Sequence, residues 1–276
     1  MIDLSLIWIL IIGLGVLIYV VLDGFDLGIG ILFPFISDRQ ERDVMMNTVA
    51  PVWDGNETWM VLGGAGLFAA FPLVYSTVLS ALYMPIILMV IALIFRGVAF
   101  EFRFKANKTK HLWDQAFIWG SILSSFLQGV ILGAYIQGIE TTNGIYTGGG
   151  LDWLTPFSLF TGISVVVLYA TLGCGWLIFK TEKMLQNRMF ELMPRLLISL
   201  LMIFVCVSIY TPLAHPQIAE RWFSQPQLFY FSPVPVLVLL FTFLAIKACK
   251  QRKEFLPFIY TLALVILAYT GFLISL

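Results

Sequence analysis

The feature that most constrains this chain is a series of long apolar segments that carry almost no charge. A helix needs about 20 largely apolar residues to cross a hydrocarbon layer about 30 Å thick. Eight segments qualify, and they lie at approximately 5–35, 52–74, 79–98, 115–137, 156–178, 196–212, 231–248 and 256–275. They are longer than the roughly 9–11 residues of a barrel strand and lack its alternation of apolar and polar side chains. The sequence therefore predicts an all-α polytopic transmembrane protein.

The orientation of these spans follows from the distribution of Lys and Arg. Acidic and basic residues balance at sixteen each, so no excess of positive charge favours a nucleic-acid partner. Fifteen of the sixteen basic residues fall on alternate connections, and Arg221 alone falls on the opposite side. Basic connections stay in the cytoplasm. We therefore predict a multi-pass membrane protein with cytoplasmic basic loops, an outside N-terminus and a retained first span.

Polar side chains gather in the first three predicted spans. An ionisable group near the bilayer centre costs about 2.5–3.5 kcal/mol on insertion scales, so each one requires a partner or a purpose. A spacing of three residues places two side chains on one helical face. The cluster comprises Asp23 and Asp26 in the first span, Asp54, Asn56 and Glu57 at the start of the second, and Arg96 at the end of the third.

Two interpretations of this polar cluster remain open. In the first, Arg96 neutralises carboxylates and Asn56 satisfies a further group, so that a buried polar knot fixes the packing of three helices. In the second, the acids form the mouth of a proton path that opens to the cytoplasm. Closely spaced acids share protons, and four acids exceed what one arginine needs for packing. The second interpretation applies best to Asp54 and Glu57, which lie near the aqueous edge.

The sequence predicts no metal or haem site in this chain. Buried haem takes axial ligands such as His, Met or Cys from inside a helical bundle. The two histidines, His111 and His215, fall in connections between spans, and no transmembrane histidine accompanies the methionines. The three cysteines, Cys174, Cys206 and Cys249, are isolated and show no paired spacing.

Glycine-rich stretches give no sign of a nucleotide loop. DGFDLGIG and VLGGAGLF follow no predicted strand and precede no phosphate-binding lysine, so their glycines are interpreted as close-packing positions between helices. The outer stretch IETTNGIYTGGGLDW is predicted to be a flexible connection.

Two motifs carry a resemblance to a known family. DGFDLGIG at 23–30 and the run from APVWDGNETW to FRGVAFEFR at 50–103 resemble the second subunit of cytochrome bd-type terminal oxidases. The resemblance implies a complex that oxidises quinol, reduces dioxygen to water and generates proton motive force. It implies that b-type and d-type haems, or b-type haems alone, are ligated by the larger subunit I, and that this chain ligates none. A small single-helix subunit, quinone and membrane lipid are further partners that it implies.

The resemblance also bears on individual residues. Asp54, in the WDGN motif with Trp53 and Gly55, matches a family acid associated with a cytoplasmic proton route. Asp23, Asp26 and Arg96 also match the family pattern, whereas the position of Glu57 resembles Gln in other members.

The family fold that the resemblance implies is two four-helix bundles followed by a peripheral helix. Here the bundles would be residues 1–137, with the polar cluster, and 138–276, within a single membrane domain. The sequence ends before the family's last helix, as a natural short form or as a fragment.

Three functional classes therefore compete. The chain is an accessory subunit of a quinol oxidase that contributes scaffold and a proton-entry route, a stand-alone proton-coupled transporter, or a purely structural membrane scaffold. Transporters commonly contain internal repeats around a midplane site. No repeat relates residues 1–137 to 138–276, and the second half has no charged residue in the interiors of its predicted spans, which favours the accessory subunit.

Overall fold

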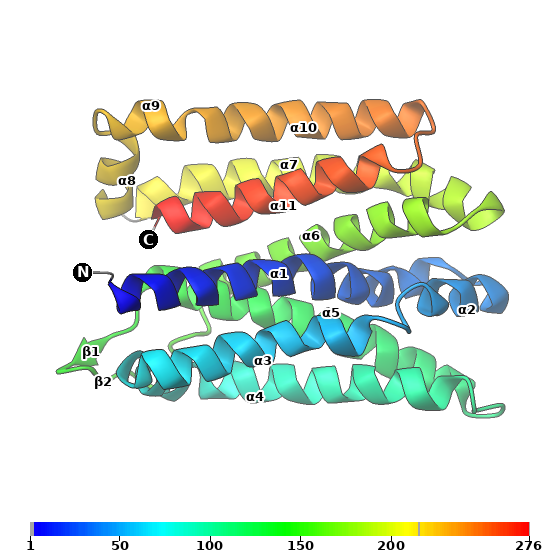
Figure 1. The fold of residues 1–276 in the computed structure, drawn as a ribbon, viewed down its shortest axis with the longest axis horizontal. Helices are drawn as coiled ribbons and strands as arrows, with labels where there is room; N and C mark the ends of the chain where they lie inside the picture. The colour runs from blue at the N-terminus through cyan, green and yellow to red at the C-terminus, as the bar shows by residue number, and fades with distance from the viewer. Residues whose placement is uncertain (1–2, 215, 276) are drawn as a thin grey trace. The chain divides into compact units, whose positions relative to one another are not determined.

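A computed structural model describes residues 3–214 and 216–275, so His215 lies outside the described residues. The described chain is almost entirely helical, and its long helices run side by side within each part of the fold (Figure 1). The prediction of an all-α membrane protein is confirmed.

The helices differ in length because some cross the membrane and others form short connections. The elements are α1 (Leu4–Leu32), η1 (Phe33–Phe35), α2 (Arg39–Asn47), α3 (Trp53–Ala70), α4 (Pro72–Arg103), α5 (Lys110–Gln137), β1 (Thr141–Thr142), β2 (Ile145–Tyr146), α6 (Pro156–Lys180), α7 (Lys183–Ala214), α8 (Pro216–Phe223), α9 (Gln227–Phe231), α10 (Pro233–Lys250) and α11 (Leu256–Ser275).

Seven helical segments of the described residues are long and apolar enough to cross a membrane. The eighth predicted span, 52–74, corresponds to α3, which is not among these seven. It is 18 residues long, and Asp54, Asn56 and Glu57 in its first turns make it less apolar than the others. Helix α3 lies against α1 and α4 for much of its length (Figure 1). Its polar start is thus held between two strongly apolar helices.

Several boundaries differ from the predicted ones for local reasons. Helix α4 begins at Pro72 rather than near residue 79, because proline at the first helical position gives up no intrahelical hydrogen bond. The same helix bends at Leu82, whose φ of −118° and ψ of 17° are not helical. The short helix α2 was not predicted, although Asp38 caps it by accepting hydrogen bonds from the backbone N–H groups of Gln40 and Glu41, both at 2.9 Å.

The outer connection after α5 contains a hairpin, so the prediction of a flexible connection is wrong for its first part. β1 and β2 pair antiparallel around Asn143 and Gly144, which both have positive φ angles. The hydroxyl of Thr77 in α4 donates a hydrogen bond of 2.6 Å to the Gly144 carbonyl. A Cβ at Gly144 would also approach Leu73 to 3.1 Å, so glycine suits both the turn and its contact with α4.

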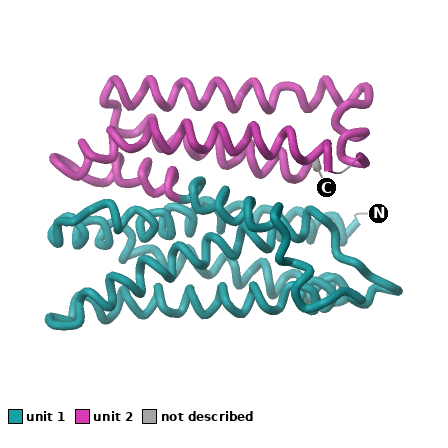
Figure 2. Tube along the Cα trace, turned by 180° about the vertical axis from the view of Figure 1, so that it is seen from behind, with its two compact units in different colours: residues 1–169 teal, residues 170–276 magenta. Residues whose placement is uncertain are grey.

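The chain divides into two compact units, residues 1–169 and 170–276 (Figure 2). The first is built from α1 to α5 and the start of α6. The second contains the end of α6 and α7 to α11, with a core that includes the fully buried Leu177, Met193 and Leu197. The division into bundles at residues 137 and 138 stays a prediction.

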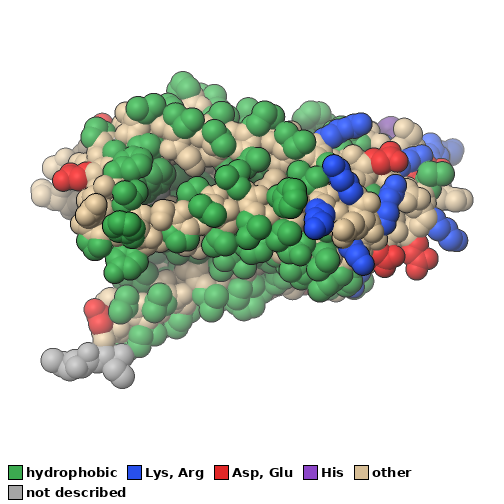
Figure 3. Space-filling model, turned by 90° about the horizontal axis from the view of Figure 1, so that it is seen from above, with side chains coloured by type: hydrophobic (Ala, Val, Ile, Leu, Met, Phe, Trp, Pro, Cys, Tyr) green, Lys and Arg blue, Asp and Glu red, His purple; other side chains and the backbone are tan. Residues whose placement is uncertain are grey.

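The face of the molecule seen in Figure 3 is largely apolar. Figure 3 shows hydrophobic side chains along most of one face, with Lys and Arg side chains gathered at one end of it. This pattern is typical of membrane helices whose basic connections share a side of the bilayer.

Candidate functional site

Arg96 is the centre of a buried polar cluster in the first unit. Its side chain is 0% exposed, and so are those of Asp23 and Asp26 on α1. Arg96 Nη1 lies 2.7 Å from Asp23 Oδ1, and Nη2 lies 3.8 Å from Asp26 Oδ2. Asp23 and Asp26 thus share one helical face and one counter-ion.

The start of α3 supplies the other side of this cluster. Asn56 Nδ2 donates a hydrogen bond of 2.8 Å to Asp26 Oδ2, which joins α3 to α1. Glu57 Oε2 lies 3.9 Å from Arg96 Nη1, and its side chain is 22% exposed. Three carboxylates therefore surround one guanidinium, and Glu57 alone among them reaches the surface.

Aromatic rings cover the same arginine. The Trp53 and Phe100 rings stack with centroids 5.0 Å apart and an interplanar angle of 7°. Arg96 Cζ lies 6.0 Å from the Trp53 ring centroid and 5.9 Å from that of Phe100. Gly97 makes room for the indole, because a Cβ there would approach the Trp53 ring to 3.3 Å. Trp53 thus places an apolar wall beside the charged centre.

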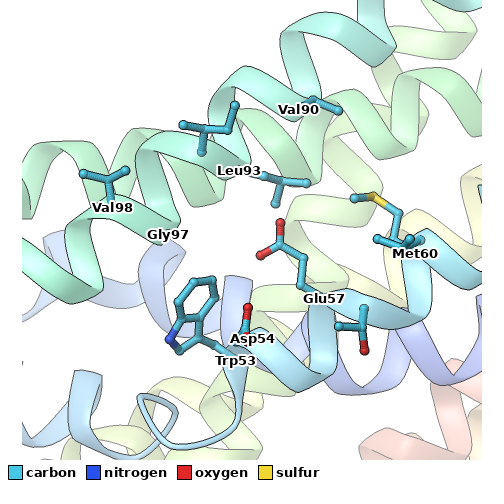
Figure 4. Close-up of a pocket in the computed structure, with 11 residues that line it drawn as sticks. Trp53, Asp54, Glu57, Met60, Val90, Leu93, Gly97 and Val98 are labelled. Carbon is cyan, nitrogen blue, oxygen red and sulfur yellow. The ribbon is translucent and has the colours of Figure 1, made fainter.

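Asp54 and Gly55 lie at the outer edge of the cluster, and both are exposed. Asp54 and Glu57 line a surface cavity of about 420 Å³ between α3 and α4 (Figure 4). Apolar residues such as Leu93, Val90 and Met60 line most of the rest. Among the described ion pairs, none joins Asp54 to Arg96. The structure therefore brings five of the six predicted polar residues together and leaves Asp54 at the rim.

A buried hydrogen-bonded chain next to this site was not predicted. The Tyr169 hydroxyl donates to Gln128 Oε1, and Gln128 Nε2 donates to the Tyr19 hydroxyl oxygen, each at 2.8 Å. Tyr19 is one helical turn from Asp23 and interacts with it. Gln128 is nevertheless a detectable sequence signal, because it is an amide in the middle of an apolar run.

A second unpredicted group of charges ties α2 to the ends of α4 and α5. We call it the α2 clamp, and its members are Arg42, Asp43, Arg103, Lys110 and Asp114. Arg103, with 0% exposure, contacts Asp43 at 2.6 Å and also hydrogen-bonds Asp114. Arg42 contacts Asp114 at 2.9 Å, and Lys110 contacts Asp43 at 2.9 Å.

The clamp sets the protonation of Asp43. Burial alone would raise the pKa of this carboxyl, but hydrogen bonds from Lys110 and Arg103 outweigh burial and hold the pKa below its usual value. Asp43 is therefore ionised at neutral pH. Sequence reasoning missed the clamp because its members lie in the connections between predicted spans, where charges are ordinary.

The described residues offer little to a metal or haem. No three His, Cys, Asp or Glu side chains within residues 3–214 and 216–275 gather closely enough to hold a metal ion. His111 is exposed at the start of α5. Cys174 is buried, and its thiol donates a hydrogen bond to the Met189 carbonyl, with Sγ and O 3.4 Å apart.

Comparisons with known proteins place this geometry in context. "Cytochrome bd-I ubiquinol oxidase subunit 2" of Escherichia coli (strain K12) is 34% identical over 197 residues, which cover 67% of this chain and 51% of that protein. "Probable cytochrome oxidase subunit 2" of Haemophilus influenzae is 34% identical over 191 residues, covering 66% of this chain and 50% of the relative. The chain thus spans about half the length of these curated relatives.

A longer alignment and a solved structure extend the likeness. "Cytochrome bd ubiquinol oxidase subunit 2" of Bacillus subtilis is 30% identical over 252 residues, covering 90% of this chain and 72% of the relative. The fold is similar to a chain of "The structure of bd oxidase from Geobacillus thermodenitrificans", with a TM-score of 0.83 at 17% identity, over 99% of this chain and 84% of that chain. This second likeness shows the fold alone.

The family model described as "Cytochrome bd terminal oxidase subunit II" matches residues 4–276. The match extends well past the two motifs at 23–30 and 50–103, through the second unit as well as the first. The buried cluster around Arg96 is built from those motifs, and the chain belongs to the cytochrome bd terminal oxidase subunit II family.

Proposed function

We propose that this chain is the haem-free accessory subunit of a quinol oxidase complex that reduces dioxygen to water and generates proton motive force. Haems of b-type and d-type, or of b-type alone, would be ligated by the partner subunit I. The observation that supports a role beyond scaffolding is the acidic rim of the α3–α4 cavity, where Asp54 and Glu57 lie beside a buried ion-pair centre. Family membership does not favour the stand-alone transporter.

The cluster divides into two parts with different work. Asp23, Asp26 and Asn56 are buried. Both aspartates pair with Arg96, and Asn56 donates a hydrogen bond to Asp26, so these residues hold α1, α3 and α4 together. Glu57 and Asp54 reach the surface. A carboxylate that lies between water and a buried polar centre can take a proton from solvent and release it inward. Glu57 reaches the buried centre at Arg96, and Asp54 lines the same cavity at the rim. We assign proton entry to these two residues and packing to the buried ones.

The direction of entry follows from where this rim lies. The start of α3 lies at the same end of the first unit as α2 and the C-terminal end of α4 (Figure 1). That end carries the basic connection with Arg103, Lys105 and Lys108. With basic loops in the cytoplasm and the N-terminus outside, protons would enter from the cytoplasm of a bacterium across its inner membrane.

The partners follow from the same proposal. The exposed acids on an otherwise apolar flank cannot face lipid cheaply, so we place protein or enclosed water against the α3–α4 cavity, supplied by the haem-bearing subunit. Quinol is the reductant of the complex, and lipid surrounds both subunits. A small single-helix subunit is a further component that this proposal allows.

Replacement of Asp54 with Asn tests the proton role. The expected complex has wild-type haem content and slower quinol-driven oxygen uptake, because the amide cannot carry a proton. Glu101→Gln is the matched control, since Glu101 is an exposed acid near the end of α4 that contacts only Lys105 within the set of described ion pairs. Unchanged oxygen uptake in Asp54→Asn and Glu57→Gln would refute the proton role, and loss of the complex would assign the acids to packing.

A further inference from the structure

The α2 clamp is built to hold a helix that leads directly into the acidic rim. Helix α2 ends at Asn47, and α3 begins at Trp53. Overlapping backbone hydrogen bonds bridge this gap, from the Thr48 N–H to the Val44 carbonyl at 3.2 Å, and from the Trp53 N–H to the Val49 carbonyl at 3.0 Å. The connection is therefore a series of closed turns, and a movement of α2 is transmitted to Trp53.

Buried apolar side chains also anchor the connection. Met45, Met46 and Val49 are each 0% exposed. Side chains packed this tightly do not slide independently of the backbone, because interiors are close-packed. The ion pairs of the clamp and the burial of Met45 and Met46 together hold α2 against the rest of the first unit.

A continuous column of rings joins the clamp to the buried arginine. Arg42 and Arg103 lie over the Phe33 ring, with Cζ 5.5 Å and 5.3 Å from its centroid. Phe33 contacts Phe117 edge to face at 4.9 Å, and Phe117 contacts Phe100 in the same way at 5.1 Å.

Phe100 completes the column, because it stacks on Trp53 and both rings cover Arg96. Two physical links, one through the backbone and one through the rings, therefore converge on Trp53. The residue after Trp53 is Asp54, and Glu57 follows one turn later on α3.

We propose that the α2 clamp is a positioning device for the acidic rim, which sets where Asp54 and Glu57 stand relative to Arg96. This inference rests on the proposed proton role of those acids. Asp43 is its central residue, because it joins Arg103 at the end of α4 to Lys110 at the start of α5. Asp43 does not touch the rim itself and acts through α2 and Trp53.

Three variants of the assembled oxidase complex test the proposal. They are Asp43→Asn, Asp43→Glu and the control Glu101→Gln. Hydrogen exchange of the backbone amides over residues 48–57 reports how firmly the connection is held, without reference to activity. Turnover and its solvent isotope effect in D₂O report proton delivery. Energetic coupling of this kind corresponds to about a 2- to 30-fold change in kcat.

The expected result has three parts. Asp43→Asn speeds amide exchange over 48–57, lowers kcat about 2- to 30-fold at unchanged quinol KM and wild-type haem content, and increases the D₂O effect. Asp43→Glu restores these values in part, because it keeps the charge, and Glu101→Gln matches wild type. If Asp43→Asn does not assemble, Lys110→Gln is measured instead, since it leaves the Arg103 contact of Asp43 in place.

Three other outcomes count against the proposal in distinguishable ways. Unchanged amide exchange over 48–57 in the clamp variants shows that the clamp does not position the connection. If Asp43→Asn shows faster exchange with unchanged kcat, and Asp54→Asn has a lowered kcat, the proton role of the acids stands but the clamp has no part in it. Faster exchange with unchanged kcat in both Asp43→Asn and Asp54→Asn refutes the proposed proton role instead.

Discussion

Replacing Arg96 with Met should be among the most damaging single changes in the first unit. The guanidinium is 0% exposed and lies within 4 Å of three carboxylates, on Asp23, Asp26 and Glu57. Removal of one partner from a buried ion pair costs about 3–5 kcal/mol, because the remaining charge is left in a medium that solvates it poorly. Asp23 and Asp26 have no exposure through which water could compensate. We expect a loss of stability in this range.

The assay is reversible unfolding of the purified protein in mixed micelles of increasing SDS content, followed by circular dichroism. Lys105→Met is the control, because Lys105 is 75% exposed and its ion pair with Glu101 lies in solvent. An exposed pair contributes about 0–1 kcal/mol, so this variant should unfold close to wild type.

A double variant separates charge from shape. Asp23→Asn added to Arg96→Met removes one of the unpaired charges, so the double variant should be more stable than the sum of the two single losses predicts, by about 0.5–3 kcal/mol. A cost below about 1 kcal/mol for Arg96→Met, or strictly additive losses, would refute the view that this arginine neutralises a buried acidic centre.

Three further predictions address other parts of the first unit. Since the clamp holds the pKa of Asp43 below its usual value, its stabilising effect is present at neutral pH, so the difference in melting temperature between wild type and Asp43→Asn should begin to shrink near pH 4 and vanish only below the lowered pKa. Gly129→Ala should lower the melting temperature, because a Cβ there would collide with the Thr161 carbonyl, whereas Gly55→Ala meets nothing within 4 Å and should be tolerated or stabilising; equal melting temperatures would contradict this. Gln128→Leu removes the partner of two buried tyrosine hydroxyls and should cost about 1–3 kcal/mol in the same SDS titration, and a loss near zero would show that other groups satisfy them.

The sequence by itself determined the class of protein and where its helices lie. Hydrophobicity is a property of each segment alone, so seven of the eight predicted spans, which match described helices long and apolar enough to cross a membrane, could be located without knowledge of their neighbours. The boundaries failed where a local signal was overlooked, as with Pro72 at the start of α4 and Asp38 at the start of α2. The polar cluster was also visible, because charge inside an apolar run is rare.

Only the tertiary structure decided how these polar residues divide among tasks. Which carboxylate meets Arg96, and which reaches the surface, depends on the rotation of α1, α3 and α4 about their axes, and no single segment fixes that rotation. Glu57 therefore turned out to contact the arginine, whereas Asp54, three residues earlier, lies at the rim.

The same reason explains the groups that were missed. The α2 clamp joins Asp43 to Arg103 and Lys110 across 60 and 67 residues of sequence, and Gln128 lies 109 positions from Tyr19. The charged members of the clamp are unremarkable in their own segments, and the polarity of Gln128 does not reveal its partners. Their energetic role arises from distances that exist only after the helices pack, because burial is what makes a hydrogen bond or an ion pair costly to lose.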